Sequence, residues 1–464
     1  DVLGSRGLGD VYKRQLIDME DIMNICSKLV IHTTDKKQNL VFNGYTGSLD
    51  IVTSQIATFL KKRNIDDPNL GKSDRSSLEE AKYILMDEDA LADAIFKRYI
   101  DYTSTALEDS DTYVICPTLN CNLFCSYCYE KGKCRRNHHL DENSLNAIFD
   151  FMTQRSVHNN RAGHISFFGG EPLLPENTEI NKKILQYARK HGFSCDITTN
   201  GTTIKDVHVA TLLRENHDLI KSIQISIDGT KEYHDNMKFT VDGCGTFDLV
   251  MENILSLLRM GILVFVRINI SRNNINEIEE LTDYFMNSQL CYFDNFDFYF
   301  APITNSDNVN DPNTLDEADL AIELERLNVL DKCQLPLLGY LVGAIAEPEK
   351  IRLPAFRRCD ANRENYYVFS PDGYVYPCME LLGQCQYAMF QYFPTFGIVC
   401  GNEPYVYSNI LHAENRVECK DCSIALLCGG GCISAKSNCT DYCTKQHQVV
   451  EKYLWHLREI FNLE

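Results

Sequence analysis

Three cysteines lie close together in the first third of the chain, in the run Cys-Asn-Leu-Phe-Cys-Ser-Tyr-Cys. They are Cys121, Cys125 and Cys128. Thiolates at this spacing fit three corners of one 4Fe–4S cluster and leave the fourth iron without a protein ligand. An iron with an open coordination position can bind a small chelating molecule. The spacing therefore predicts a cluster that takes part in chemistry as well as storing an electron.

Four further motifs follow the cysteine run, each at or within an apolar, strand-like stretch. They are Gly169-Gly170-Glu171-Pro172, Thr198-Thr199-Asn200-Gly201, the run 224–229 with Ser226, and the run 266–270 with Arg267. Glycines allow a backbone to approach a ligand closely, and a guanidinium can pair with a carboxylate through two hydrogen bonds. These residue types suit the binding of a small charged molecule beside the cluster.

The cysteine run and the four motifs together resemble radical S-adenosylmethionine (radical SAM) enzymes, with Tyr127 at the aromatic position of the family's cysteine loop. The resemblance implies that Cys121, Cys125 and Cys128 hold the catalytic cluster and that its open iron binds SAM. Cleavage of SAM would give a radical that abstracts hydrogen from a substrate; the cofactor carries this chemistry and the protein orients it. The implied cofactor-site residues are Tyr127, Gly169, Gly170, Glu171, Thr199, Asn200, Ser226 and Arg267.

The C-terminal third carries a second group of cysteines, spaced x2, x5 and x3 within residues 419–432. This pattern resembles the SPASM extension of radical SAM proteins, and the resemblance implies two auxiliary 4Fe–4S clusters. The implied ligands of the first are Cys359, Cys378 and Cys432. The implied ligands of the second are Cys419, Cys422, Cys428 and Cys443.

Two ligand assignments stay open in this region. The extra cysteine that fully ligated relatives carry just before the first SPASM position is missing here. Cys333, Cys385 or Cys400 can replace it, or the first auxiliary cluster has an open iron. Cys439 competes with Cys443 as the last ligand, and we prefer Cys443 because a helical stretch follows it directly.

The main alternative to iron in the second cysteine group is zinc. The four cysteines of residues 419–432 also fit a structural zinc site with four thiolate ligands. A disulfide framework is a weaker alternative, because the motifs need thiolates. The radical SAM resemblance of the preceding residues favours iron–sulfur clusters.

Composition limits the classes of partner. The formal net charge of −20 argues against nucleic acid as a main partner, because phosphate binding needs a basic surface. No apolar stretch approaches the roughly 18 residues of a membrane span, so we expect a cytoplasmic protein with no membrane partner. We also expect a reducing electron donor such as ferredoxin or flavodoxin.

Residues 111–305 alternate strand-like and helical stretches six times. The strand-like stretches lie near residues 113–117, 164–168, 195–199, 222–227, 263–270 and 296–300. Repeating βα units predict a parallel sheet with right-handed crossovers. Six units fit the α/β fold of radical SAM enzymes, a partial (β/α)6 TIM-like barrel, with the motifs at the carboxyl ends of strands.

The rest of the chain divides around this core. We expect a non-native or disordered stretch at 1–15, an N-terminal small α+β unit at 16–108 and the radical SAM core at 109–305. A helical bridge at 306–358 and a SPASM domain with a C-terminal helix at 359–464 follow.

The sequence of the N-terminal unit predicts a hairpin followed by helices. Residues 29–31 and 40–42 predict the hairpin, Ser48 a helix cap, and Ser77 with Glu80 a capping box for a helix reaching about Ile100. This order resembles the small winged-helix module that binds leader peptides in peptide maturases. The alternative is a structural cap on the barrel.

The leading functional hypothesis is a maturase that abstracts hydrogen from a ribosomally synthesised peptide and forms a thioether or other crosslink. The alternative is an anaerobic sulfatase-maturating enzyme, which forms formylglycine. Such enzymes carry an Asp directly after the cysteine at position 378, whereas this chain has Met379 and then Glu380, a candidate proton acceptor. A third hypothesis, an electron-transfer protein without enzymatic activity, is disfavoured by the intact Glu171, Ser226 and Arg267.

Overall fold

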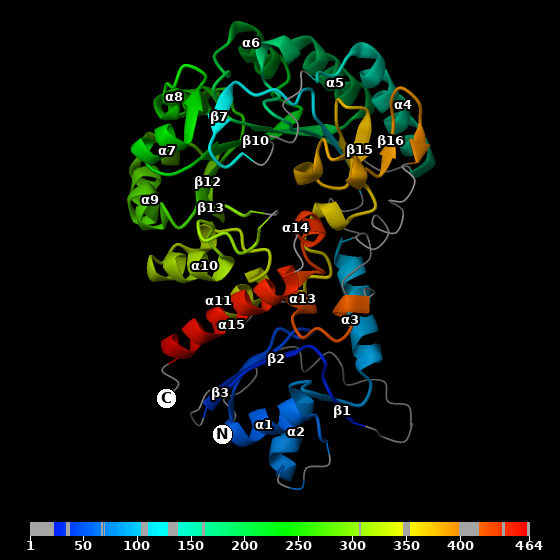
Figure 1. Cartoon of the computed structure of the whole chain (residues 1–464), viewed down its shortest axis with the longest axis vertical. Coiled ribbons are helices and arrows are strands. Elements are labelled where there is room, and N and C mark those ends of the chain that lie inside the picture. The colour runs from blue at the N-terminus through cyan, green and yellow to red at the C-terminus, as the bar shows by residue number, and fades with distance from the viewer. Residues whose placement is uncertain are drawn as a thin grey trace.

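A computed structural model describes the greater part of the chain, from the N-terminal unit to the C-terminal helix (Figure 1). The described residues are 23–33, 38–65, 68, 70–103, 110–128, 138–159, 163–305, 308–346, 353–398, 417–438 and 441–461. The expected stretch at 1–15, and the candidate ligands Cys400 and Cys439, lie outside them. None of the described helices combines the length and the apolar composition needed to cross a membrane.

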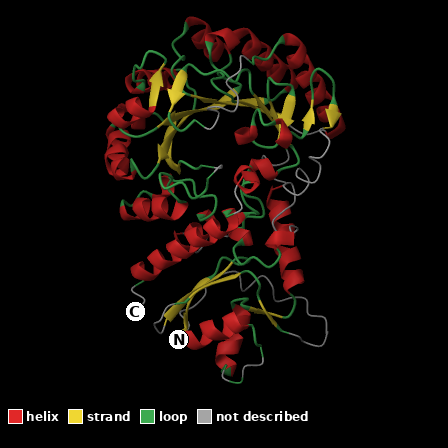
Figure 2. Ribbon diagram, viewed as in Figure 1, coloured by secondary structure: helices red, strands yellow, loops and turns green. Residues whose placement is uncertain are grey.

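A curved parallel sheet forms the barrel. Its strands, in spatial order, are β13 (Phe296–Pro302), β12 (Val264–Ile270), β10 (Ile220–Ile227), β9 (Ser194–Thr199), β8 (Gly163–Phe167) and β6 (Asp111–Ile115). All five pairings between them are parallel, which confirms the predicted α/β barrel-like core. Figure 2 shows the helices on the outer side of this curved sheet.

Helices follow most of the barrel strands and cover the outside of the sheet. They are α4 (Glu142–Asn159), α5 (Thr178–His191), α6 (Val207–Glu215), α7 (Lys231–Met237), α8 (Phe247–Arg259) and α9 (Ile278–Asn287). Alternate strand residues such as Ile197, Ile225 and Val266 are buried in one core with Ile184 of α5 and Ile254 of α8. The period of two along a strand turns the residues between them, among them Ser226 and Arg267, to the opposite face of the sheet.

The cysteine-rich region continues the same sheet. β14 (Tyr366–Phe369) pairs in parallel with β6, and β15 (Tyr374–Tyr376), β16 (Phe390–Gln391) and β17 (Gly397–Ile398) extend the sheet by antiparallel pairing. The result is a sheet of ten strands that joins the core to the C-terminal region. Residues that follow β14 are therefore fixed relative to the cysteine loop that follows β6.

The N-terminal unit contains the expected hairpin but different helices. β2 (Leu29–His32) and β3 (Gln38–Asn43) are antiparallel, as predicted, and residues 49–53 add a third strand, β4 (Leu49–Thr53). The Ser48 cap was a wrong prediction: the chain extends through β4, and Thr53 caps α1 (Ser54–Lys62) by accepting from the Ile56 amide at 3.3 Å.

The second predicted helix of this unit is two helices. α2 (Lys72–Glu80) begins before Ser77, so the predicted capping box at Ser77 and Glu80 was wrong. The short strand β5 (Ile84–Leu85) then pairs with β1 (Asn24–Ile25) and interrupts the helical path. α3 (Glu88–Thr103) follows and runs towards the barrel (Figure 1).

The N-terminal sheet packs on both faces. On one face Val41 and Val52 are buried against α1. On the other face Val30, Leu40 and Phe42 share a core with the C-terminal helix α15 (Tyr442–Ile460), with α11 (Gly339–Ala346) and with α13 (Ala425–Cys428). In Figure 1, α15 lies between the barrel and the N-terminal sheet. The two ends of the described chain therefore form one hydrophobic core.

Ion pairs fasten α15 to the element that follows the barrel. Lys452 of α15 contacts Asp316 at 2.6 Å, just before α10 (Glu317–Arg326), and His456 contacts Glu325 at 2.9 Å. α14 (Ile433–Asn438) links the cysteines at 428 and 432 to α15. The C-terminal cysteines are thus held between the barrel and the N-terminal unit.

Candidate functional site

The cysteine run leaves β6 and forms a small ribbon over the barrel mouth. Within it, β7 (Leu123–Cys125) pairs antiparallel with β11 (Lys238–Thr240), and Cys125 lies opposite Lys238. Cys121 and Cys128 flank the strand, and all three thiols are partly buried. Pairing with β11 fixes this loop to the end of α7, beside the carboxyl end of β10.

The Cys121 thiol lies near one carboxylate, that of Glu171, and one other thiol, that of Cys125. Their charges disfavour the thiolate form of Cys121. Desolvation by burial, followed by the charges of Glu171 and Cys125, raises its pKa to about 12, while the amide of Asn200 at 3.7 Å opposes the shift. A thiol of this kind becomes a thiolate when a metal coordinates it. The donor chemistry of the three thiols fits an iron–sulfur cluster. The described residues include no group of three or more His, Cys, Asp or Glu side chains already arranged around a metal ion.

Glu171 joins the ends of two barrel strands. Its carboxylate accepts from the Thr199 hydroxyl at 2.6 Å, from the backbone amide of Asn200 at 2.7 Å and from the backbone amide of Leu173 at 2.9 Å. The side chain is fully buried, and desolvation raises its pKa although the hydrogen bonds oppose that shift. Glu171 therefore fixes the Gly-Gly-Glu-Pro turn to the Thr-Asn-Gly turn after β9.

The two glycines before Glu171 allow the turn to touch the start of the cysteine loop. Gly170 donates to the Thr118 carbonyl at 3.1 Å, and Glu171 donates to the Asn120 carbonyl at 2.8 Å. A Cβ at Gly170 would lie 2.3 Å from the Asn120 oxygen, and one at Gly169 would lie 2.4 Å from the Thr118 oxygen. Gly169 also has a φ of +122°, a conformation that favours glycine. Side chains at either position would push the cysteine loop away.

Asn200 connects the turn after β9 to the cysteine loop. Its side-chain amide donates to the side-chain oxygen of Asn122 at 2.9 Å. The side-chain amide of Asn122 in turn donates to the Thr202 hydroxyl at 2.9 Å. The same Asn200 amide approaches Cys121. Asn200 is thus placed to orient the first cysteine of the run.

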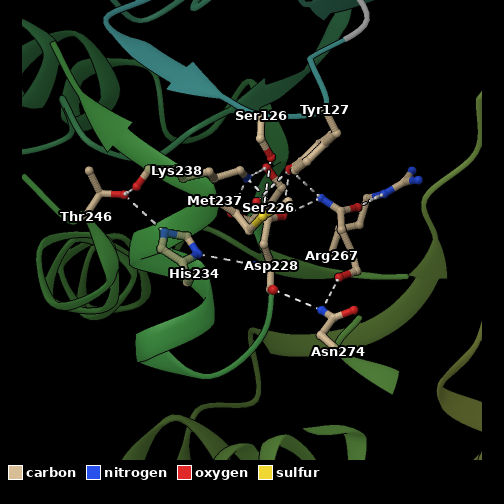
Figure 3. A network of polar contacts seen from close by, with 11 residues as sticks. Ser126, Tyr127, Ser226, Asp228, His234, Met237, Lys238, Thr246, Arg267 and Asn274 are labelled. Carbon is tan, nitrogen blue, oxygen red and sulfur yellow. Dashed lines mark hydrogen bonds and ion pairs between the residues drawn. The ribbon is translucent and has the colours of Figure 1, made fainter. Parts of the chain in front are cut away.

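A buried carboxylate, Asp228, lies at the centre of a polar network at the end of β10 (Figure 3). The hydroxyl of Tyr127 donates to it, the amide of Asn269 donates at 2.8 Å, and the ammonium of Lys238 lies 3.5 Å away. Desolvation and the Asp228 charge raise the pKa of Tyr127, so the phenol stays protonated as a donor. Asp228 therefore ties the cysteine loop to strands β10 and β12.

Ser226 and Arg267 lie side by side on neighbouring parallel strands. The Ser226 hydroxyl accepts from Lys238 at 2.6 Å, and the Nε of Arg267 donates to the Asn269 oxygen at 3.0 Å. Figure 3 shows the outer end of the Arg267 guanidinium directed away from Asp228. Arg267 thus lies on the strand next to Ser226 and carries a guanidinium that can pair with an anion.

His234 supports the network from behind. Its Nδ1 accepts from the Asp228 amide at 3.2 Å, and its Nε2 lies 3.1 Å from the Thr246 hydroxyl, so the neutral tautomer with a proton on Nε2 satisfies both contacts. Burial, followed by the charge of Lys238, lowers its pKa to about 4, against the opposing effects of Asp228 and Asp235. A neutral His234 holds the turn after β10 in place.

Sequence reasoning missed several members of this network: Asp228, Lys238, Asn269, Asn122 and Asn274. A signal existed for Asp228, because it directly follows an apolar strand and precedes a glycine with a φ of +126°. Lys238 carries no such signal, since its position depends on the pairing of β11 with β7.

The C-terminal cysteines fall into two neighbouring groups. In the first, desolvation raises the pKa of Cys378, and the charges of Glu380, Cys432 and Cys359 add to the shift. Desolvation and Glu380 likewise raise the pKa of Cys432. These mutual effects indicate that Cys359, Cys378, Cys432 and Glu380 lie close enough for their charges to interact.

The second group lies towards the N-terminal unit. Burial raises the pKa of Cys428, with further contributions from Cys422 and Cys443 that oppose the effect of Arg358. The Sγ of Cys422 lies 3.4 Å from His447 on α15. Cys419 is buried at the end of the short helical turn Val417–Cys419. A zinc site made of residues 419–432 alone would use Cys428 and Cys432 together. The charge effects instead connect Cys428 with Cys443, and Cys432 with Cys378.

The structure describes two of the candidate fourth ligands, Cys333 and Cys385. Cys333 forms a β-bridge with Phe300 of β13, and Cys385 is exposed in a short helical turn. Arg358, by contrast, is a cation that sequence reasoning missed. It contacts Glu317 at 3.2 Å. Burial lowers the pKa of Arg358, but the charges of Tyr442, Glu317, Cys428 and Cys432 outweigh burial and raise it. Arg358 therefore lies between the two cysteine groups.

A cavity of about 540 Å³ opens between the N-terminal sheet and α15. Its lining includes Val30 of β2, Ile424 after the Cys419–Cys422 turn, and His447, Glu451 and Trp455 of α15. His32 contacts the Glu451 carboxylate at 2.6 Å and packs edge-on against Trp455, with ring centroids 4.9 Å apart. The cavity thus borders both the N-terminal unit and the second cysteine group.

Comparisons with known proteins agree with this architecture. Residues 115–285 match the Radical SAM superfamily. A cysteine-type anaerobic sulfatase-maturating enzyme of Clostridium novyi (strain NT) is 26% identical over 341 residues, which are 68% of this chain and 85% of the relative.

Two solved structures share the fold. Native anSMEcpe with bound AdoMet has a TM-score of 0.55 at 19% identity and covers 76% of this chain and 100% of its own. Streptococcus suis SuiB bound to precursor peptide SuiA has a TM-score of 0.50 at 15% identity and covers 90% of this chain and 97% of its own. The second likeness extends over more of this chain than the first.

Proposed function

This chain is a radical SAM enzyme, and we propose that it is a peptide or protein maturase that abstracts hydrogen from a ribosomally synthesised peptide and leaves a thioether or other crosslink. When bound, a 4Fe–4S cluster and SAM supply the electron and the radical for this step. A reducing protein such as ferredoxin or flavodoxin is the proposed electron donor.

One observation carries the catalytic part of the proposal: Glu171 and Asp228 both anchor the cysteine loop. Glu171 binds the loop through the Asn120 carbonyl, and Asp228 binds it through Tyr127. We assign Cys121, Cys125 and Cys128 to the cluster. The loop is thereby held at two points over the strand ends, where parallel barrels place their chemistry.

The remaining residues have proposed roles around the cofactor. Gly169 and Gly170 are assigned to the backbone beside the cofactor, and the close packing of their turn on the cysteine loop supports this assignment. Thr199 and Asn200 hold the facing turn. Arg267 would pair with the carboxylate of SAM, and the Ser226 hydroxyl would provide a further hydrogen-bonding group for the cofactor. In this assignment Tyr127 positions the cysteine loop through Asp228.

The C-terminal cysteine groups are the proposed sites of two auxiliary clusters. Cys359, Cys378 and Cys432 would hold the first, and Cys419, Cys422, Cys428 and Cys443 the second. The mutual pKa effects within each group support this division. Glu380, beside Cys378 and Cys432, is the proposed acceptor of a substrate proton. The auxiliary clusters would take up the electron that remains when the product forms, or bind the substrate.

The N-terminal unit is the proposed binding site for a peptide leader. The cavity between β2 and α15 supports this role, because it combines an apolar lining with the partly exposed ring of Trp455 and the carboxylate of Glu451. The structure of SuiB bound to the precursor peptide SuiA is similar in fold to this protein over 90% of this chain. An extended peptide on this surface would have its modified residues free to reach the barrel.

Anaerobic sulfatase maturation is the second candidate function. It is favoured by the Clostridium novyi relative, whose sequence is matched over 85% of its length. This chain has Met379 at the position where such enzymes are expected to carry an Asp, so the neighbouring Glu380 would have to accept the proton from a different direction.

Mass spectrometry of peptide products distinguishes the two candidates. Under reducing, anaerobic conditions with SAM, the proposed maturase removes two hydrogens from a Cys-containing precursor peptide encoded beside it and leaves a crosslinked product. Formylglycine on a sulfatase-derived peptide, with no change in the precursor, would replace the leading proposal by the second. Failure to cleave SAM under the same conditions would contradict both.

A further inference from the structure

A buried lysine joins the N-terminal unit to the second cysteine group. The ammonium of Lys28 donates to the carbonyl of Cys419 at 3.0 Å, to that of Lys420, and to that of Cys422 at 3.4 Å. Lys28 lies between β1 and β2, whereas its acceptors lie nearly four hundred residues later in the chain. One side chain thus provides donors for three carbonyl groups of the Cys-x2-Cys turn.

The position of Lys28 is fixed by its neighbours. Its side chain is only 2% exposed, and its carbonyl accepts from the Gly44 amide at 2.8 Å. A Cβ added at Gly44 would lie 3.1 Å from the Lys28 oxygen and 3.6 Å from Leu426 of α13. The preceding residue, Ser27, donates through its amide and its hydroxyl to Glu88 of α3. These hydrogen bonds hold the backbone from which the Lys28 side chain reaches the turn.

The energetic reason for this arrangement is the shape of the turn. A Cys-x2-Cys turn brings several carbonyl groups close together, and a buried carbonyl without a partner costs free energy. An ammonium group has three donors and no acceptor, so it can satisfy three carbonyls at once. Lys28 does this at a place where Cys419 is itself buried. The shape of the turn then depends on a residue of another unit.

We propose that Lys28 is a positioning residue for the second auxiliary cluster: it holds the Cys419–Cys422 turn in the shape that presents both thiolates to the cluster. The inference rests on the proposed function, which assigns Cys419, Cys422, Cys428 and Cys443 to that cluster. Lys28 does not contact the iron. It acts through the backbone of the turn, so the N-terminal unit and the second cluster assemble together.

Coupling of this kind works in both directions. If the N-terminal unit stabilises the cluster-binding shape of the turn, then binding of the cluster must stabilise the N-terminal unit to the same extent. The strand β2 begins directly after Lys28, so its backbone amides report this stabilisation. Hydrogen exchange of β2 is therefore a readout that does not depend on catalytic activity.

The first experiment compares iron and sulfide content after anaerobic reconstitution of the full chain. The variant Lys28→Met keeps a long unbranched side chain but removes all three donors, and Lys28→Arg keeps a cation with several donors. Lys61→Met is the matched control, because Lys61 belongs to the same unit and its ammonium donates to the exposed hydroxyl of Thr33. We expect Lys28→Met to lose about one third of its iron, from about twelve to about eight per chain, while Lys61→Met loses none. Lys28→Arg should retain more iron than Lys28→Met.

The outcomes separate this inference from the proposed function. A wild-type protein that binds about four irons has no auxiliary clusters, and both proposals then fall. A wild-type protein and a Lys28→Met variant that both bind about twelve irons would overturn the role of Lys28 alone.

Hydrogen exchange decides the case in which Lys28→Met does not fold. In the wild type, reconstitution should slow the exchange of the β2 amides several-fold, and the same change should be absent from a Cys419→Ala/Cys422→Ala variant. Equal exchange of β2 before and after reconstitution would overturn the inference.

Discussion

The hydroxyl of Tyr127 lies 2.7 Å from both carboxylate oxygens of Asp228. The two residues belong to the cysteine loop and to the turn after β10, about a hundred positions apart in the chain. Asp228 is fully buried, so each donor to its carboxylate offsets part of a large desolvation cost. This contact is therefore a principal link between the loop and the barrel.

Replacement of Tyr127 by Phe should destabilise the fold. Because the change removes a donor to a buried charged group, we expect a loss of about 1.5–3 kcal/mol in the free energy of unfolding, measured by urea denaturation of the iron-free protein. Tyr292→Phe is the control, since that ring is 87% exposed. Equal midpoints for the two variants would show that Asn269 and Lys238 suffice for Asp228.

Glu171→Gln should weaken the junction between the Gly-Gly-Glu-Pro turn and the turn after β9. A carboxamide can accept at one oxygen only, so its NH2 group faces one of the three donors that Glu171 now accepts from. We expect a loss of about 1–3 kcal/mol in the free energy of unfolding and a smaller amount of iron retained by the cysteine loop. Glu252→Gln, with its side chain 67% exposed, should change neither quantity.

Protonation of His234 should lower stability in mild acid. Its pKa is about 4 in the folded protein and about 6.5 in an unfolded chain, so the unfolded state binds the proton first as the pH falls. The contribution to stability is complete above pH ~6.5 and is lost as the pH falls towards about 4, with a loss of about 2 kcal/mol by pH ~5. Urea unfolding at pH 7 and 5 measures it. The difference between the two pH values should be smaller in His234→Gln; an unchanged difference would assign the effect to other groups.

Removal of the first cysteine set should remove one cluster. We expect Cys121→Ala/Cys125→Ala/Cys128→Ala to bind about eight irons per chain where the wild type binds about twelve. Cys244→Ala, which changes an exposed cysteine outside the three groups, should behave as the wild type. About four irons together with bound zinc in the wild type would instead mean that the C-terminal cysteines form a structural metal site.

Fluorescence should report peptide binding at the cavity beside α15. Trp455 is the single tryptophan of the chain and is 46% exposed, so a peptide that covers it should change its emission. Trp455→Ala should weaken binding about tenfold, which corresponds to ~1.4 kcal/mol. Trp455→Phe is the control for the loss of the indole signal with the ring retained. A peptide that is modified by the enzyme without any change in the emission of Trp455 binds elsewhere.

The sequence predicted the barrel well because its strands carry a local signal. Alternate apolar residues along β8, β9, β10 and β12 pack under the helices, and the motifs follow at the strand ends. The same reasoning failed at Ser48, where Ile51 and Val52 lie on a strand that pairs with β3 and do not form a helical face. Tertiary pairing decided that segment against its local helix pattern.

The supporting residues of the site were harder to predict, for a physical reason. Lys238 meets Ser226 and Asp228 because β11 pairs with β7, and Lys28 meets the Cys419–Cys422 turn because two ends of the chain share a core. Such contacts depend on segments far apart in the sequence. Residue types and spacings identify groups that do chemistry, whereas the groups that hold them are known only when the chain is folded.

The core shared by the N-terminal sheet and α15 has a consequence for how such enzymes can be recombined. Phe42 and Leu40 pack on residues of the C-terminal region, so exchange of the N-terminal unit alone for that of another enzyme would leave a mismatched interior. A functional hybrid would need to inherit α15 and the turn at residues 419–422 together with the new unit. A change of peptide specificity through this unit would then be constrained by the region that we propose holds the second auxiliary cluster.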